Sequence, residues 1–337
     1  MEGRIAGRQA FAWTLALAAL AASGVAQARI AAPNVALAPL EADEAASGSS
    51  SIDAAQPRQI GYPRVVAELQ TAAAMSRELQ WARVPEGGLV AAVSVTSPGA
   101  VALRVGVRVG EIPASATLRF YAPSESAAHE VTAETLLAAL ARNRRAGETG
   151  SDARTYWSPL VSGDTVVMEV ELPAGSDPSR LALTAPILSH LAIAPEALAK
   201  DDERASIVYT IDGSTYACPG SMLAATVVRT RLGDAADAAP GAYFVTQSRC
   251  VSSQAAASTA QAFWPRAAQG AEASGVGAEL LYASSETDTT FLALDAPPPN
   301  AALHAKALAP GVDPALEQWI GAAPFRAAVD VGAFSLP

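Results

Sequence analysis

The sequence predicts an all-β protein made of two successive blocks of short strands. Runs that alternate apolar and polar residues recur along the chain, and each run is bounded by Gly, Pro, Asp or Ser. A charged stretch, residues 195–203, separates the two blocks within the 337 residues. Half of the residues are hydrophobic although only 6% are aromatic and 17% are charged, which is typical of an Ala-rich globular protein. We therefore expect two folded parts joined near residue 200.

Residues 1–28 are predicted to be a secretory signal peptide. Arg4 and Arg8 form a basic start, residues 11–22 an apolar core, and residues 26–28 read Ala-Gln-Ala, a small-residue cleavage site. The alternative is a membrane anchor, but the apolar run is shorter than the roughly 20 residues that a spanning helix needs. We expect the protein to be secreted or periplasmic, with no membrane span after the signal is removed.

Residues 29–60 are expected to be a disordered pro-segment or linker, because they are rich in Ala, Ser, Pro and acidic residues and show no sustained period. Residues 65–81 then have a loosely helical apolar spacing, although Trp81 could equally open a strand.

Residues 61–195 are predicted to form a β-sandwich. Residues 89–95 and 102–109 alternate with period 2 around Ser-Pro-Gly-Ala, which predicts a β-hairpin. Further strands are expected over residues 117–121 and 166–172, and Thr132 with Glu134 supplies cap chemistry for a short helix. Several short strands at this spacing are typical of a sandwich.

The second block, residues 203–309, is also predicted to be all-β. Its expected strands are residues 206–210, 216–218, 222–223, 242–246, 279–282 and 289–294. The tail, residues 310–337, reads as irregular except for a short helical pattern around residues 316–320.

Composition also excludes several classes of partner and cofactor. The formal net charge is −10 and basic residues do not cluster, which argues against nucleic-acid binding. The chain has two cysteines, Cys218 and Cys250, and in an exported protein one disulfide is expected. The three histidines, His129, His190 and His304, are isolated in sequence, so we expect no metal site and no cofactor.

Four segments of the second block carry familiar motifs in a familiar order. Residues 216–223 read YACPGSML, residues 243–250 YFVTQSRC, residues 280–294 LLYASSETDTTFLAL and residues 296–299 APPP. In this order they resemble the amino-terminal half of bacterial trypsin-like serine peptidases of the lysyl endopeptidase type. Segments at residues 156–165, 171–175 and 189–191 look like the pro-region sandwich of the same secreted precursors, so the resemblance covers roughly residues 61–309.

This resemblance implies a fold and a set of site residues. It implies an N-terminal β-sandwich pro-region followed by a partial trypsin-like β-barrel, with Cys218 paired to Cys250. Asp288 matches the aspartate of the family's catalytic triad, and Arg249 occupies the histidine position. A guanidinium remains protonated and cannot take a proton from a serine, so Arg249 is not competent as a base. We expect Arg249 and Asp288 to form an ion pair instead.

The nucleophile of the triad is also expected to be missing. The chain contains no Gly-Asp-Ser-Gly-Gly, and the 134 residues from Arg204 to Pro337 are fewer than the roughly 200 that two closed barrels ordinarily need. The resemblance is therefore to a truncated and degenerate member of the family, unless the reading frame is broken.

Other polar and aromatic residues are assigned structural roles. His190 is expected to be a satisfied strand residue, and His129 and His304 to be exposed. Trp81, Trp157 and Trp264 read as core or edge aromatics rather than as a ligand platform, and Asp164 and Asp212 as turn residues.

Two functions remain at this point. The first is a secreted serine endopeptidase homologue that is inactive because of Arg249 and the missing nucleophile barrel. The second is a non-catalytic extracellular binding or peptidase-regulating protein that uses the β-sandwich, with a peptidase barrel or another extracellular protein as its partner. Capture of a related active peptidase would distinguish them.

Overall fold

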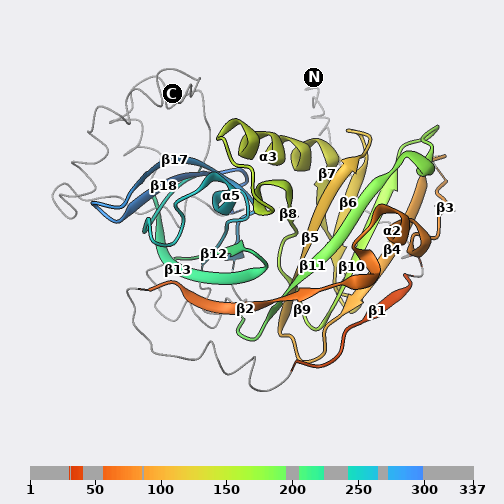
Figure 1. Ribbon diagram of the computed structural model, residues 1–337, viewed down its shortest axis with the longest axis horizontal. Helices are drawn as coiled ribbons and strands as arrows, with labels where there is room; N and C mark the ends of the chain where they lie inside the picture. Colours follow the sequence, from red (N-terminus) through yellow and green to blue (C-terminus); the bar gives the residue numbers. More distant parts are fainter. Residues whose placement is uncertain are drawn as a thin grey trace, which may run out of the picture.

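The computed structural model describes residues 30, 32–40, 56–85, 87–194, 205–223, 242–264 and 272–298. The predicted signal peptide, the connector at 195–204 and the tail at 310–337 lie outside these residues. Within them the chain is dominated by β-strands, which confirms the all-β class (Figure 1). No helix in the described part of the chain is long and apolar enough to cross a membrane.

The N-terminal domain, as we call residues 30–194, is a sandwich of two sheets. The first sheet has the order β1-β4-β10-β6-β7, with β3 also on β4. Its strands are β1 (Asn34–Ala36), β3 (Ala82–Arg83), β4 (Leu89–Thr96), β6 (Thr117–Tyr121), β7 (His129–Thr132) and β10 (Thr165–Leu172). The facing strands of the second sheet are β2 (Arg58–Val65), β5 (Ala102–Glu111), β8 (Tyr156–Trp157), β9 (Val161–Ser162) and β11 (Ala182–Leu191).

The sandwich core is formed by the inward residues of both sheets. Leu103 and Val105 of β5 meet Phe120 of β6 and Met168 of β10 in one buried cluster. Helix α3 (Ala133–Arg145) adds Leu136 and its neighbours to this cluster.

The N-terminus of α3 has the predicted cap: the Thr132 hydroxyl accepts a hydrogen bond from the Thr135 amide at 3.1 Å. The helical pattern at residues 65–81 becomes the short η1 (Ala67–Leu69) and α2 (Ala72–Glu78).

The hairpin predicted at residues 89–109 is wrong, although both of its strands exist. β4 pairs with β1, β3 and β10 in the first sheet, whereas β5 pairs with β8, β9 and β11 in the second. The turn between them, with Gly99 at φ +84°, therefore crosses from one sheet to the other. Both strands are buried along most of their length, so each needs neighbours on both edges and a facing sheet, which a two-stranded hairpin does not provide.

The prediction of a disordered pro-segment or linker over residues 29–60 is wrong for two stretches, which form strands. β1 pairs in parallel with β4, with Val35 opposite Val95, and Val35 is buried in the sandwich core. β2 begins at Arg58. β1 has only three residues, which is too short for an alternating pattern to be recognised. The composition of the surrounding segment therefore predicted a linker. Residues 41–55 lie outside the described residues.

The second part, residues 205–298, contains the strands expected from the second block and three elements that the sequence did not reveal. The expected strands are β12 (Ala205–Ile211), β13 (Ser214–Leu223), β14 (Ala242–Thr246), β17 (Ala278–Ser284) and β18 (Thr289–Leu294). The additional elements are α5 (Gln254–Ala257), β15 (Gln261–Trp264) and β16 (Glu272–Ala273).

The strands of the second part follow one hydrogen-bonded path, β15-β12-β13-β14-β18-β17, which wraps around a core that includes Phe244 and Leu292. Among the described residues no pairing joins β17 back to β15, so the path does not close. The barrel is open along this seam, as expected for a partial barrel.

The two parts share a sheet. β2 of the N-terminal domain pairs with β11 on one edge and with β13 on the other, where Gly61 lies opposite Thr215 and Arg58 opposite Ala217. Figure 1 shows β2 passing under the barrel strands and continuing beneath the sandwich. Hydrogen bonding therefore continues across the boundary predicted near residue 200.

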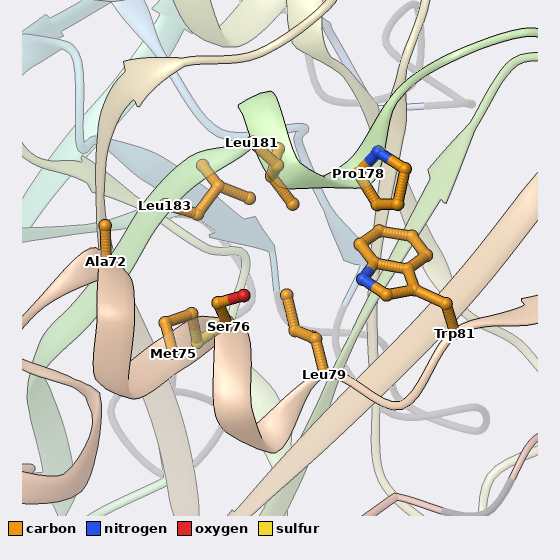
Figure 2. Close-up of a pocket in the computed structure, with 8 residues that line it drawn as sticks. All are labelled: Ala72, Met75, Ser76, Leu79, Trp81, Pro178, Leu181 and Leu183. Carbon is orange, nitrogen blue, oxygen red and sulfur yellow. The ribbon is translucent and has the colours of Figure 1, made fainter.

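A small apolar pocket opens at the far end of the sandwich. It lies between α2, which contributes Met75 and Leu79, and the start of β11, where Leu181 and Leu183 face it. Figure 2 shows the Trp81 ring beside Pro178 at one side of this pocket. Trp81 is therefore a partly buried edge aromatic, as expected.

Candidate functional site

The candidate site lies where β14 ends and β18 begins. β14 and β18 are antiparallel, with Thr246 opposite Thr290, so the turn after β14 and the turn before β18 are neighbours. Arg249 lies in the first turn and Asp288 in the second. The sheet register therefore brings together two residues that are 39 positions apart in sequence.

Asp288 accepts several hydrogen bonds from the neighbouring turn. The Arg249 Nε donates to Oδ2 at 2.7 Å, and a terminal guanidinium nitrogen of Arg249 contacts the same oxygen. The Arg249 amide and the Ser248 hydroxyl each donate to Oδ1 at 3.2 Å. The predicted ion pair is confirmed, and both carboxylate oxygens are occupied by donors from residues 248 and 249.

The backbone of Asp288 has a left-handed conformation, with φ of +48°. Asp and Asn tolerate this region better than other side chains that have a Cβ. The turn therefore favours Asp at this position on conformational grounds as well as for its charge, and Asn is the substitution that best preserves the turn.

Partial burial and the neighbouring Arg249 shift the pKa of Asp288 in opposite directions. Desolvation raises the pKa of the carboxyl group, whereas the side-chain hydrogen bonds and charge of Arg249 lower it, and the net pKa lies below the usual value. The side chains of Arg249 and Asp288 remain 35% and 30% exposed. The pair is thus close to the surface, where solvent screens it and its contribution to stability is about 1 kcal/mol or less.

We expect Arg249→Met to remove a pH-dependent part of the stability. The folded-state pKa of Asp288 lies below its unfolded value. The pair therefore stabilises the fold above the unfolded pKa, near 4, and this stabilisation disappears as the pH falls through the folded pKa. Urea midpoints at pH 7 and pH 3 should differ less in Arg249→Met than in the native chain.

The matched control is Asp288→Asn, which keeps the left-handed turn but removes the charge. Asp288→Asn removes the titrating group itself and should reduce the pH-dependent difference at least as much, because the Arg249 amide and the Ser248 hydroxyl still act on Asp288 in Arg249→Met. The double variant should lose nothing beyond the loss in Asp288→Asn. Additive losses in the two single variants would contradict the assignment of this pH dependence to the pair.

The disulfide predicted from the cysteine count and from the family resemblance is present. Cys218 of β13 is bonded to Cys250, 32 positions later, and both residues are buried in the barrel core. The bond fixes the turn that carries Arg249 to the neighbouring strand.

The glycine of the Cys-x-Gly motif has a packing reason. A Cβ at Gly220 would lie 2.2 Å from the Phe244 ring, which leaves no space for a side chain.

The remaining candidate residues have structural roles. His190 is buried, and its Nδ1 is 2.8 Å from the Ser97 hydroxyl. The Arg64 guanidinium donates to the same Ser97 oxygen at 3.1 Å. Burial and the positive charge of Arg64 lower the pKa of His190. This serine–histidine contact is closed to substrate because Ser97 is fully buried.

The other residues singled out in the sequence behave in simple ways. His129 is exposed, whereas Trp157 and Trp264 are buried. Asp212 lies in the turn between β12 and β13 with φ of +48°. His304 lies outside the described residues. No group of three or more His, Cys, Asp or Glu side chains in the described ranges is placed to hold a metal ion.

The sequence did not reveal one important residue, Arg104. It lies on β5, on the face opposite to Leu103 and Val105, and the alternating pattern gives no sign that this face is covered. The second part of the chain covers that surface, and Arg104 is fully buried. The alternation along β5 shows that the strand has two faces. It does not show that the face with Arg104 is covered by another part of the chain.

Taken together, the sandwich, the shared sheet and the arginine–aspartate pair define a class: a sandwich domain joined to an open barrel whose site turn is held by the Cys218–Cys250 disulfide. Comparison with known proteins supports this class. Residues 31–192 match the family model described as the lysyl endopeptidase N-terminal domain. The chain is also 26% identical over 264 residues to the lysyl endopeptidase of Pseudomonas aeruginosa. This alignment covers 66% of the chain.

The two matches together support a precursor of the lysyl endopeptidase type. The matched region spans 52% of the length of the Pseudomonas protein. No solved structure matches the chain.

Proposed function

We propose that this chain is an exported, non-catalytic homologue of trypsin-like serine peptidases. The observation that carries the proposal is the occupation of Asp288 by Arg249. In a serine peptidase the aspartate orients a neutral histidine that accepts the serine proton. Here both oxygens of the carboxylate are engaged by Arg249 and Ser248, and the guanidinium has no basic lone pair to offer. General-base catalysis from position 249 is therefore excluded on chemical grounds.

Export rests on the leader pattern of residues 1–28, on the cystine and on the similarity to a lysyl endopeptidase. A buried disulfide is expected to persist in the periplasm or outside the cell, where thiols oxidise. N-terminal sequencing of protein recovered from the culture medium and the periplasm would test this, with cleavage after residue 28 as the expected result.

We expect the purified chain to show no peptidase activity. It should not hydrolyse lysyl or arginyl anilide substrates above background and should not react with a fluorophosphonate probe, which labels activated serines. Turnover that disappears in Asp288→Asn, together with fluorophosphonate labelling, would overturn the proposal.

The matched variant is Arg249→His, which supplies the missing base beside the same aspartate. Labelling that appears only in Arg249→His would show that Arg249 is the defect. If Arg249→His also stays unlabelled, the loss of function extends beyond the base. Both results agree with a non-catalytic native chain.

A second candidate is a peptidase regulator that captures another enzyme with its β-sandwich. The sandwich does hold a barrel, because β2 pairs with β13. That barrel belongs to the same chain, however, so the face is already occupied, and this ranks the regulator second. Co-purification with a related active peptidase at submicromolar affinity would reverse the order.

A further inference from the structure

The cluster of Arg64, Ser97 and His190 ties the first strand of the N-terminal domain to a buried histidine. The Arg64 guanidinium on β2 donates to the Ala38 carbonyl at 2.6 Å and to the Ser97 hydroxyl at 3.1 Å. The same Ser97 oxygen lies 2.8 Å from Nδ1 of His190. We call Arg64 with its two acceptors, the Ala38 carbonyl and the Ser97 hydroxyl, the arginine latch. The latch holds the chain just after β1 and meets the histidine at one oxygen atom.

β1 is a short edge strand with few backbone hydrogen bonds. It has three residues and pairs in parallel with residues 94–96 of β4, at the edge of the first sheet (Figure 1). The Ser94 amide donates to the Pro33 carbonyl at 2.8 Å, and the Leu37 amide donates to the Thr96 carbonyl at 2.9 Å. An edge segment of this kind opens at a lower cost in free energy than the core strands. Loss of the latch should therefore act first on residues 33–38.

His190 faces the sandwich core from β11. It lies opposite Tyr62 of β2 and Leu103 of β5, and only 4% of its surface is exposed. Arg104, the next residue on β5, points to the opposite side of this sheet. The two residues directly beside His190 on its own face are thus uncharged at neutral pH.

The nearby charges oppose the uptake of a proton by His190. The positive charge of Arg64 lowers the pKa of His190, in the same direction as burial. Asp164 lies beside the turn, where its carbonyl accepts from the Ser97 amide at 2.8 Å, but its exposed carboxylate accepts from the Thr165 hydroxyl at 3.0 Å. In the described ranges no carboxylate forms an ion pair with His190 that would offset the charge of Arg64.

Protonation changes what the Ser97 oxygen has to accept. Both nitrogens of a protonated imidazole are donors, so Nδ1 then donates to the oxygen that already accepts from Arg64. Two cations would share one neutral hydroxyl group at a buried position, where like charges repel with little screening. Movement of Arg64 away from His190 relieves this repulsion, and Arg64 then loses its hydrogen bond to the Ala38 carbonyl.

We propose that His190 is a pH-sensitive switch for β1: uptake of a proton by His190 opens the arginine latch and releases residues 33–38 from the edge of the first sheet. This inference concerns the sandwich and does not depend on whether the chain is catalytic.

The direction of the pH dependence follows from the two states of the latch. The pKa of His190 in the closed state lies below the ordinary value near 6.5, so the closed state binds fewer protons than the released state. Release therefore becomes easier as the pH falls below about 6.5, and the effect levels off once the pH is below the pKa of the closed state.

The test follows the amide hydrogen exchange of Leu37 and Ser94 in the full chain at pH 7.5 and pH 5.5, corrected for the intrinsic pH dependence of exchange. We expect the protection of both amides to fall by about threefold or more at pH 5.5, where uptake of one proton allows about tenfold. In His190→Gln the protection should be the same at both pH values.

Matched variants separate His190 and Arg64 from the other histidines and arginines. His129→Gln/His304→Gln leaves His190 as the remaining histidine of the three in the chain, and it should keep the full pH response. Arg58→Met removes an exposed arginine from the same strand, β2, and should change nothing. Arg64→Met should lower the protection of Leu37 and Ser94 already at pH 7.5.

A direct titration keeps the test decisive if His190→Gln lacks the near-ultraviolet circular dichroism of the native fold. In His129→Gln/His304→Gln the imidazole NMR signals report the pKa of His190, which should rise when Arg64→Met is added and stay unchanged when Arg58→Met is added. Equal protection of Leu37 and Ser94 at both pH values in the native chain would overturn the proposal. A pH response that persists in His190→Gln, or a pKa of His190 that is indifferent to Arg64→Met, would also overturn it.

Discussion

Replacing Phe244 with alanine is expected to lower the free energy of unfolding by about 3–5 kcal/mol, the range found for buried Phe-to-Ala changes. Phe244 lies on β14 between Met222 of β13 and Leu292 of β18, and its side chain is fully buried. Its ring packs edge-on against Trp264 at a centroid distance of 6.2 Å. The backbone of Gly220 approaches the same ring so closely that a Cβ there would clash. The cavity would therefore lie at the centre of the barrel core.

The measurement is the urea midpoint at pH 7, with two comparison variants. Phe244→Leu should recover part of the loss, because it fills part of the cavity. Val65→Ala changes a residue that is 64% exposed and should shift stability by less than about 0.5 kcal/mol. A loss in Phe244→Ala no larger than that in Val65→Ala would show that the barrel core contributes little to the stability.

Removal of the Cys218–Cys250 disulfide is expected to have the second large effect on stability. Replacing Cys218 and Cys250 together with alanine should lower the free energy of unfolding by about 3–4 kcal/mol, since the unfolded chain is no longer closed into a loop of 32 residues. Alanine is preferred to serine because both positions are buried, and a serine hydroxyl would need a partner there.

Dithiothreitol is the control for this variant. It should destabilise the native chain towards the value of the double variant, and it should not affect the double variant. The turn that carries Arg249 should also exchange its amide hydrogens faster once the bond is removed, because Cys250 no longer fixes it to β13. Equal stability of the native chain and the double variant would contradict this role of the disulfide.

The sequence predicts the strands of this protein better than it predicts their pairing. Alternation identified β10 and β18 correctly, since a half-buried strand shows its period in eight or fewer residues. The same signal placed β4 and β5 in one hairpin, whereas they belong to different sheets. Alternation describes the faces of a strand and carries no information about which strand lies beside it.

The sequence also predicts only some of the residues that matter for the site. Arg249 and Asp288 were found through motif order, and the register of β14 and β18 explains why they meet. Arg104 is not among the predicted site residues, because its place in the alternating run gives no sign of burial. Its burial depends on residues 210 and 259, which lie more than a hundred positions away and approach only in the folded chain. Long-range packing of this kind leaves no local pattern in the sequence.

The strand β2 also constrains how this protein can change over time. Gly61 lies where the two parts meet, and a Cβ there would come within 2.9 Å of the Ser189 hydroxyl and 3.1 Å of Thr215. A larger residue at position 61 therefore requires smaller neighbours on both β11 and β13 at once. In recombination between relatives, an N-terminal domain can therefore be joined to another barrel only if the residues at positions 61, 189 and 215 remain compatible in size.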